Sequence, residues 1–297
     1  MTSQDQQQQE EERRDRSQEG VRRILVAVDS STQNERTLRA AADLAVRLQA
    51  ELHAVFVENP ELLRLENNPS VRQINLPQGM GSQVSEGSIE RGLWAQARRL
   101  QDVLGQMADQ ARVEWSFRVV RGSASHELRS AASEVDLVVV EAAGRSVVSQ
   151  VRLESSTHRA VSDVDQSVLY LNQGARPLRS LVVVYDDSDQ ANTCTDAAMR
   201  MMAGGNQAGG AMLTVVLPTE DRQQASKWRE RAEERLRAYG VPAHFRRTSP
   251  GRIQWLVKAV EGVHGDMLIQ SANSPTLKGE SATELLEQID CPVLLVR

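Results

Sequence analysis

The sequence predicts an α/β protein built from two tandem domains, each with a parallel sheet. Three observations lead to this prediction. The chain has 297 residues, which is enough for two ordinary hydrophobic cores. Short apolar runs alternate with amphipathic segments of about 10–20 residues, as in successive strand–helix–strand units. Three segments of the first half also recur in the second half, in the same order.

The first predicted element is a strand at residues 23–29, a nearly continuous apolar run rich in branched side chains. Such runs are typical of parallel strands covered on both faces, so this strand is expected at the centre of its sheet. An amphipathic helix is expected from about residue 32 to residue 50, with Ser30 or Ser31 as its cap. Its apolar positions recur at spacings of three and four: Leu38, Ala41, Ala45 and Leu48.

The other elements of the first half follow from the same two periodicities. A second strand at 51–57 precedes a segment at 59–87 that is rich in Asn, Pro, Gly and Ser and is expected to form a loop or flap. The next helix is marked by Leu93, Ala97, Leu100, Leu104 and Met107. The remaining predicted elements are a strand at 113–120, a helix at 123–132, a strand at 136–140, a short helix near 155–161 and a strand at 167–171.

The second half repeats these elements with shrinking offsets. The repeated pairs are separated by 157, 130 and 125 residues: 23–29 and 180–186, 135–140 and 265–270, and 166–172 and 291–297. The offset falls chiefly because the second copy lacks about 27 residues at the place where the first carries 59–87. We therefore predict a disordered polar tail at 1–20, a first domain at 21–172, a linker at 173–178 and a shorter second domain at 179–297.

Composition argues against several classes of function. The net charge of −5 gives no general attraction for nucleic acid, and three Phe and three Tyr supply few stacking platforms. No apolar run approaches the ~18 residues that span a bilayer, and the first 20 residues match neither a secretory signal nor a transit peptide. The two cysteines, Cys194 and Cys291, form no CxxC pair and are predicted to be buried, inert thiols. A cytoplasmic location is expected.

No catalytic or metal-binding constellation is apparent. The five histidines fall in separate elements without ligand spacing, and neither a GxSxG elbow nor a phosphate-binding loop of the GxxxxGK[ST] type occurs. A helix around 225–239 carries an apolar stripe, for which ordinary packing on the sheet is favoured over a partner-binding face. That stripe comprises Ala225, Trp228, Ala232, Leu236 and Tyr239.

Three landmarks resemble the universal stress protein family. The sequence ILVAVDSS at 24–31 resembles the family's first strand and turn, VDLVVV at 135–140 its fourth strand, and CPVLLVR at 291–297 its last strand. The resemblance covers nearly all of residues 21–297. It implies a doubly wound, Rossmann-like domain in each half, with five parallel strands in the order 3-2-1-4-5. It also implies that the two domains pair as a pseudo-dimer through their terminal strands.

The resemblance further implies where a nucleotide would bind. In nucleotide-binding members an aspartate after the first strand lies near the adenosine, and a loop G-x-x-G-(nine residues)-G-Ser/Thr after the fourth strand wraps the phosphates. Carried onto this chain, those positions are Asp29 and Ser30 in the first turn and Gly144 and Ser155 in the loop. Glu141 and Glu154 replace two of the loop glycines, so the site is expected to be degenerate.

The second half departs further from the family pattern. After Ser271 it cannot be fitted to the glycine loop, and Asp186 and Asp187 would add negative charge at the mouth of the pocket. Only Lys278 and Gly279 keep an anion site open there, so the second domain is expected to be structural.

Three hypotheses of function follow. The preferred one is a non-catalytic stress-response or regulatory binding protein without a cofactor, which pairs its own domains and contacts a protein partner or a second copy. The second is an ATP-binding switch in the first domain, with Asp29 near the adenosine. The third is a regulator in trans of a transporter or sensor kinase, because residues 57–65 resemble the version of this domain in potassium-sensing kinases.

Overall fold

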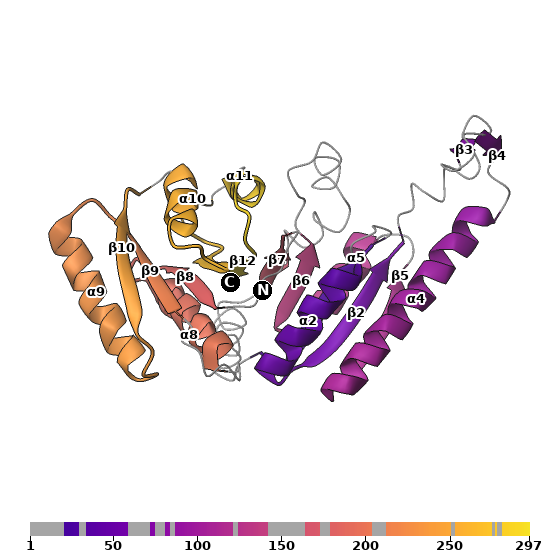
Figure 1. Ribbon diagram of the computed structural model, residues 1–297, viewed down its shortest axis with the longest axis horizontal. Helices are drawn as coiled ribbons and strands as arrows, with labels where there is room; N and C mark the ends of the chain where they lie inside the picture. The colour runs from indigo at the N-terminus through magenta and orange to yellow at the C-terminus, as the bar shows by residue number, and fades with distance from the viewer. Residues whose placement is uncertain are drawn as a thin grey trace, which may run out of the picture.

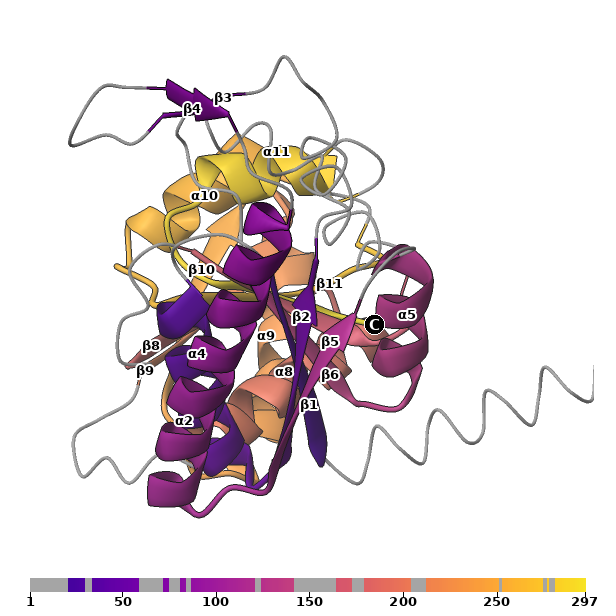
Figure 2. The same ribbon diagram turned by 90° about the vertical axis from the view of Figure 1, so that its right-hand side faces the viewer.

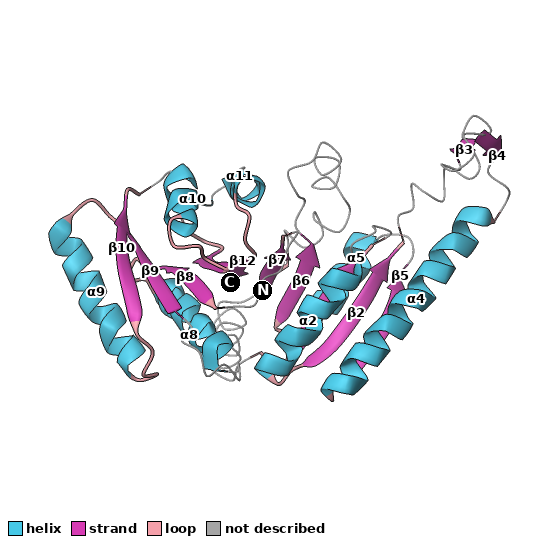
Figure 3. Ribbon diagram, viewed as in Figure 1, coloured by secondary structure: helices cyan, strands magenta, loops and turns pink. Residues whose placement is uncertain are grey.

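The computed structural model shows one ten-stranded sheet with helices on both faces (Figures 1 and 3). The strand order is β10-β9-β8-β11-β12-β7-β6-β1-β2-β5. The structure describes residues 21–29, 34–58, 72–74, 81–83, 87–120, 124–141, 164–172, 179–203, 212–250, 253–274, 277 and 281–297.

The first half of the chain supplies five neighbouring strands, all parallel. Their order β5-β2-β1-β6-β7 is the predicted 3-2-1-4-5, with the apolar first strand at the centre. Strand β1 is buried along five of its six residues because helices cover both faces of the sheet. The five strands are β1 (Arg23–Val28), β2 (Glu51–Val57), β5 (Trp115–Val120), β6 (Leu137–Glu141) and β7 (Ser167–Leu171).

The second half supplies the other five strands in the same order, β10-β9-β8-β11-β12. These strands are also parallel to one another. They are β8 (Ser180–Val184), β9 (Met212–Pro218), β10 (Ala243–Thr248), β11 (Met267–Ser271) and β12 (Val293–Val296). The predicted fold class is therefore confirmed, while the exact limits of the two domains stay a prediction.

The register of the strands reproduces the internal repeat. In the first half Ile24 of β1 pairs with Leu137 of β6, and in the second half Leu181 of β8 pairs with Met267 of β11. The predicted offset of 157 residues leads from Ile24 to Leu181, and the offset of 130 residues leads from Leu137 to Met267. The same residue positions therefore meet in both sheets, as expected of a duplicated domain.

The two halves join through their fifth strands. β7 and β12 are antiparallel neighbours, with Leu169 opposite Leu294 at the middle of the pairing. Both leucines are buried, so the sheet and its core continue across the joint. Because every other neighbouring pair in this sheet is parallel, the two sets of strands run in opposite directions.

Helices divide between the two faces according to their place in the repeat. Those of the first two crossovers in each half pack on one face: α2 (Asn34–Leu48), α4 (Ser88–Ala111), α8 (Asp189–Ala203) and α9 (Arg222–Arg237). Later helices pack on the other: α5 (Ala124–Ser133), α10 (Ile253–Glu261) and α11 (Ser281–Gln288). In Figure 2, α2 and α4 lie on the opposite side of β1 and β2 from α5.

Two local predictions differ from the structure, and a third concerns residues that it does not describe. The segment expected to be a loop or flap contains a two-stranded antiparallel sheet, β3 (Arg72–Ile74) with β4 (Gly81–Gln83). The stripe on α9 was expected to include Tyr239, but the helix ends at Arg237 and the Tyr239 side chain is exposed. The short helix predicted near 155–161 lies outside the described residues.

Candidate functional site

The strand order reverses beside β1, and that is where ligands bind in doubly wound sheets. Asp29 follows β1 directly and is partly buried. Its backbone carbonyl accepts a hydrogen bond from the side-chain amide of Asn34, a buried residue at the start of α2. The first turn is therefore tied to the helix that follows it, and this holds Asp29 at the carboxyl edge of the sheet.

Two further carboxylates end the strands on either side of Asp29. Ala27 of β1 pairs with Val55 on β2 and with Val140 on β6. Glu58 follows β2 and is only 1% exposed, and Glu141 is the last residue of β6 and is partly buried. Three acidic residues therefore stand at three adjacent strand ends.

Only part of the predicted nucleotide site can be placed. The structure locates Asp29 and Glu141 at neighbouring strand ends, whereas Ser30, Gly144, Glu154 and Ser155 lie outside the described residues. Sequence reasoning missed Glu58. The signal that could have found it is its position, as the first residue after the apolar run of β2.

In the second half, the equivalent aspartate is engaged in its own turn. The carboxylate of Asp186 accepts hydrogen bonds from the backbone N–H of Ser188, at 3.2 Å, and from its hydroxyl, at 2.6 Å. The hydroxyl oxygen of Ser188 in turn accepts from the backbone N–H of Ala191, at 3.1 Å, in the first turn of α8. Asp186 therefore fixes the start of that helix.

The neighbouring Asp187 is also engaged. Its carboxylate forms an ion pair with Arg231 of α9 and accepts a hydrogen bond of 3.4 Å from the Tyr185 hydroxyl. The pKa of Tyr185 is raised to about 12, first by burial and then by the negative charge of Asp187. Lys278 and Gly279, the residues that kept an anion site open in this half, lie outside the described residues.

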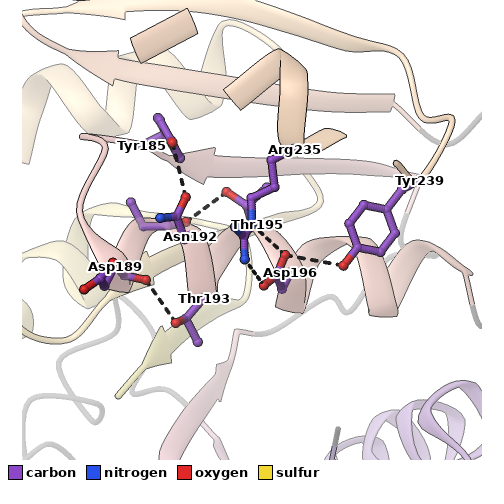
Figure 4. A network of polar contacts seen from close by, with 9 residues as sticks. Tyr185, Asp189, Asn192, Thr193, Thr195, Asp196, Arg235 and Tyr239 are labelled. Atoms are coloured by element: carbon purple, nitrogen blue, oxygen red, sulfur yellow. Dashed lines mark hydrogen bonds and ion pairs between the residues drawn. The ribbon is translucent and has the colours of Figure 1, made fainter. Parts of the chain in front are cut away.

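Helices α8 and α9 are linked by a second polar network (Figure 4). The guanidinium of Arg235 donates to Asp196 with an Nε–Oδ1 distance of 2.9 Å, and the hydroxyl of Tyr239 donates to the same oxygen at 3.4 Å. The hydrogen bond to Asp196 is the main cause of a raised pKa for Arg235. On the same face of α8, one turn before Asp196, the amide oxygen of Asn192 lies 3.2 Å from the Tyr185 hydroxyl, which shares its one proton between Asn192 and Asp187.

The aspartate of the VDLVVV motif has a structural role. The carboxylate of Asp136 accepts the backbone N–H groups of Arg22 and Arg23 at 2.8 and 2.9 Å, which ties the start of β6 to the start of β1. Asp266 makes the same contacts in the second half, with the N–H groups of residues 179 and 180 at 2.9 and 2.8 Å. Sequence reasoning used this motif to recognise the repeat but did not predict these hydrogen bonds.

Cysteines and histidines offer little chemistry. Cys194 and Cys291 are free and buried, as predicted, and burial is the main cause that raises the pKa of each thiol to about 12. His53 lies between Ser116, 2.8 Å from its Nδ1, and Glu51, 3.3 Å from its Nε2. Over the described residues, no cluster of three His, Cys, Asp or Glu side chains could hold a metal ion.

Comparisons with known proteins identify the family to which the chain is similar. The model of the universal stress protein family matches residues 20–171. No curated protein matches the chain. Within the described part of the chain, no helix is both long and apolar enough to cross a membrane.

Solved structures show the same fold over nearly the whole chain. A universal stress protein from Archaeoglobus fulgidus is 17% identical with a TM-score of 0.67, covering 93% of this chain and 96% of its own. A putative universal stress protein from Pseudomonas aeruginosa is 13% identical with a TM-score of 0.58, and the match covers 93% of both chains. At these identities the likeness concerns the fold alone.

Proposed function

The chain belongs to the universal stress protein family, and from this premise we propose that it is a non-catalytic regulatory binding protein of the cytoplasm. Its nucleotide sites are degenerate, and its response to the state of the cell is read by a protein partner. The observation that carries this proposal is the row of carboxylates at the switch point of the first half: Asp29, Glu58 and Glu141.

Electrostatics is the reason why this row disfavours a triphosphate. A carboxylate about 4 Å from a phosphate charge costs about 4 kcal/mol at an effective dielectric of about 20. That is roughly three decades of affinity. This edge carries three acidic residues, each of which also makes contacts of its own.

The second half supports the same proposal for a different reason. Asp186 is used by the turn that starts α8, and Asp187 is paired with Arg231. A ligand that needed either carboxylate would have to replace contacts that already hold the turn together. This half is therefore proposed to stabilise the molecule and to present a surface, without binding a nucleotide of its own.

Calorimetric titration of the full chain with ATP and Mg²⁺ tests the proposal. We expect no binding in the micromolar range. Changing Glu141→Gln should strengthen ATP binding by about tenfold or more, because it removes one negative charge beside Asp29. Glu134→Gln is the matched control, since Glu134 is an exposed residue that follows α5 and lies before β6, and it should change nothing.

Two results would count against the proposal. One is micromolar ATP binding by the unchanged protein, which would favour the nucleotide switch. The other is phosphate release from ATP above the rate of a buffer blank, which would make the chain an enzyme.

A further inference from the structure

Strand β10 lies at the outer end of the sheet in the second half, toward the left of Figure 1. In the described part of the chain it pairs with β9 alone, so its other side has no strand beside it. Such an open side presents a row of backbone N–H and C=O groups, with which another extended chain can pair. The side chains on and around β10 therefore determine which chain can pair there.

Exposed basic side chains stand on both faces of this edge. His244, Arg246 and Arg247 are exposed. Phe245 packs in the cluster on the α9 face, and successive residues of a strand point to opposite faces, so Arg247 belongs to that face and Arg246 to the other. The Arg246 guanidinium lies against Gly262, just after α10. A strand added here would thus have an arginine beside it on each face.

The surroundings of β10 are basic in a protein that is acidic as a whole. Residues 222–248, from the start of α9 to the end of β10, carry eight basic and three acidic side chains. The corresponding residues of the first half, 88–120, carry five basic and four acidic side chains and end in the other edge strand, β5. Since the whole chain has a net charge of −5, the β10 edge is the one that differs in sign.

Most of these basic charges are not balanced within the protein. Three of the eight side chains form ion pairs: Arg229, Arg231 and Arg235. The other five form none within the residues that the structure describes: Arg222, Lys227, Arg237, Arg246 and Arg247. Their charges are therefore available to a partner of opposite sign.

We propose that the open edge of β10 binds an extended acidic segment of a protein partner, which adds to the sheet as a further strand. Backbone hydrogen bonds would hold the segment, and acidic side chains opposite Arg246 and Arg247 would select it. A basic segment, or β10 of a second copy, would place like charges opposite each other, which is unfavourable. A nucleic acid would meet the charges but has no strand backbone to pair with β10.

This proposal rests on the proposed regulatory function only in naming a class of partner for it. The titration with ATP tests that function, and a titration with peptides tests the edge, so either can fail alone. The probe is a fluorescein-labelled peptide, Val-Thr-Val-Glu-Glu-Val-Thr-Val, added to the full-length chain and followed by fluorescence anisotropy. We expect it to bind more weakly as salt is raised, and a version with Lys-Lys in place of Glu-Glu to bind at least about tenfold more weakly.

Two further peptides test the pairing of backbones. Each carries N-methyl groups on alternate backbone nitrogens, so that one of the two lacks the N–H groups that would face β10. At least one should bind about tenfold more weakly than the parent peptide. Absence of binding by the parent peptide would overturn the proposal. Equal binding of the parent and both methylated peptides would also overturn it, because charge alone would then account for the affinity.

Variants locate the binding edge. Changing Arg246→Gln together with Arg247→Gln should weaken binding of the parent peptide by about tenfold. Arg118→Gln is the matched control, because Arg118 pairs with Val55 in β2 as Arg246 pairs with Val216 in β9, but at the other end of the sheet. Thermal unfolding checks that the variants are folded, and Arg247→Gln alone gives an answer if the double variant is unstable. A loss of binding in Arg118→Gln and not in the β10 variants would place the peptide at β5 and overturn the proposal.

Discussion

Gly105 and Gly92 lie in the same helix, α4, but in different surroundings. A Cβ added to Gly105 would lie 2.9 Å from Cζ2 of Trp115 on β5, whereas a Cβ on Gly92 would meet nothing within 4 Å. Replacing either glycine by alanine gains about 1 kcal/mol of helix propensity. We therefore expect Gly92→Ala to raise the free energy of unfolding by up to about 1 kcal/mol and Gly105→Ala to lower it by about 1–3 kcal/mol.

Urea unfolding of the two variants measures this difference. Since the propensity gain is common to both, the gap between them reports the close contact of Gly105 with Trp115. Equal stabilisation of both variants would mean that the indole, whose Nε1 donates to Asp109 at 3.1 Å, moves aside at little cost.

Single residues at the candidate site show what sequence reasoning can and cannot reach. Asp29 and Asp186 were placed at equivalent strand ends because the repeat is visible in the sequence. Their surroundings were not predictable, because the use of Asp186 by Ser188 depends on the conformation of one turn. Glu58 was overlooked because an acidic residue after a strand is ordinary. It becomes informative only when the sheet places it beside Asp29.

At the scale of elements, Asp136 and Asp266 each tie two neighbouring strands together through hydrogen bonds to backbone N–H groups. Removing the carboxylate of Asp136 would leave the backbone N–H groups of Arg22 and Arg23 without their present acceptor. We expect Asp136→Ala to lower the free energy of unfolding by about 1–3 kcal/mol, with a similar loss for Asp266→Ala in the second half. Urea titration of the intact chain gives both values.

A control separates the effect of losing these hydrogen bonds from a general effect of charge. Glu134→Ala removes an exposed carboxylate two residues before Asp136 and should change stability by less than about 0.5 kcal/mol. Asp136→Asn keeps one acceptor oxygen, so its loss of unfolding free energy should lie between those of Glu134→Ala and Asp136→Ala. Equal losses for Glu134→Ala and Asp136→Ala would contradict the role of the hydrogen bonds.

The long periodic elements were predictable, and the short ones were not. The strands at 51–57 and 167–171 have the predicted bounds because their apolar runs begin and end abruptly. The pair β3 and β4 was missed because strands of three residues carry no measurable alternation. Tyr239 fits the spacing of the α9 stripe, but the chain leaves the helix at Arg237 and turns at Gly240, which has a positive φ of 65°.

At the scale of the whole molecule, the core crosses the joint between the halves. One hydrophobic cluster contains residues of α2 and α4 from the first half and of α8 and α9 from the second. Calorimetry should therefore show a single unfolding transition, with equal van't Hoff and calorimetric enthalpies. Leu104→Ala, a buried change in α4, should lower the temperature of that single transition and not split it. Two transitions, of which only one shifts in Leu104→Ala, would show that the halves unfold independently.

The antiparallel pairing of β7 with β12 also determines which way the strand ends of each half face. Because the strands of the two halves run in opposite senses, their carboxyl edges face opposite ends of the sheet. Occupants at the two edges would stand back to back, separated by the full length of the strands.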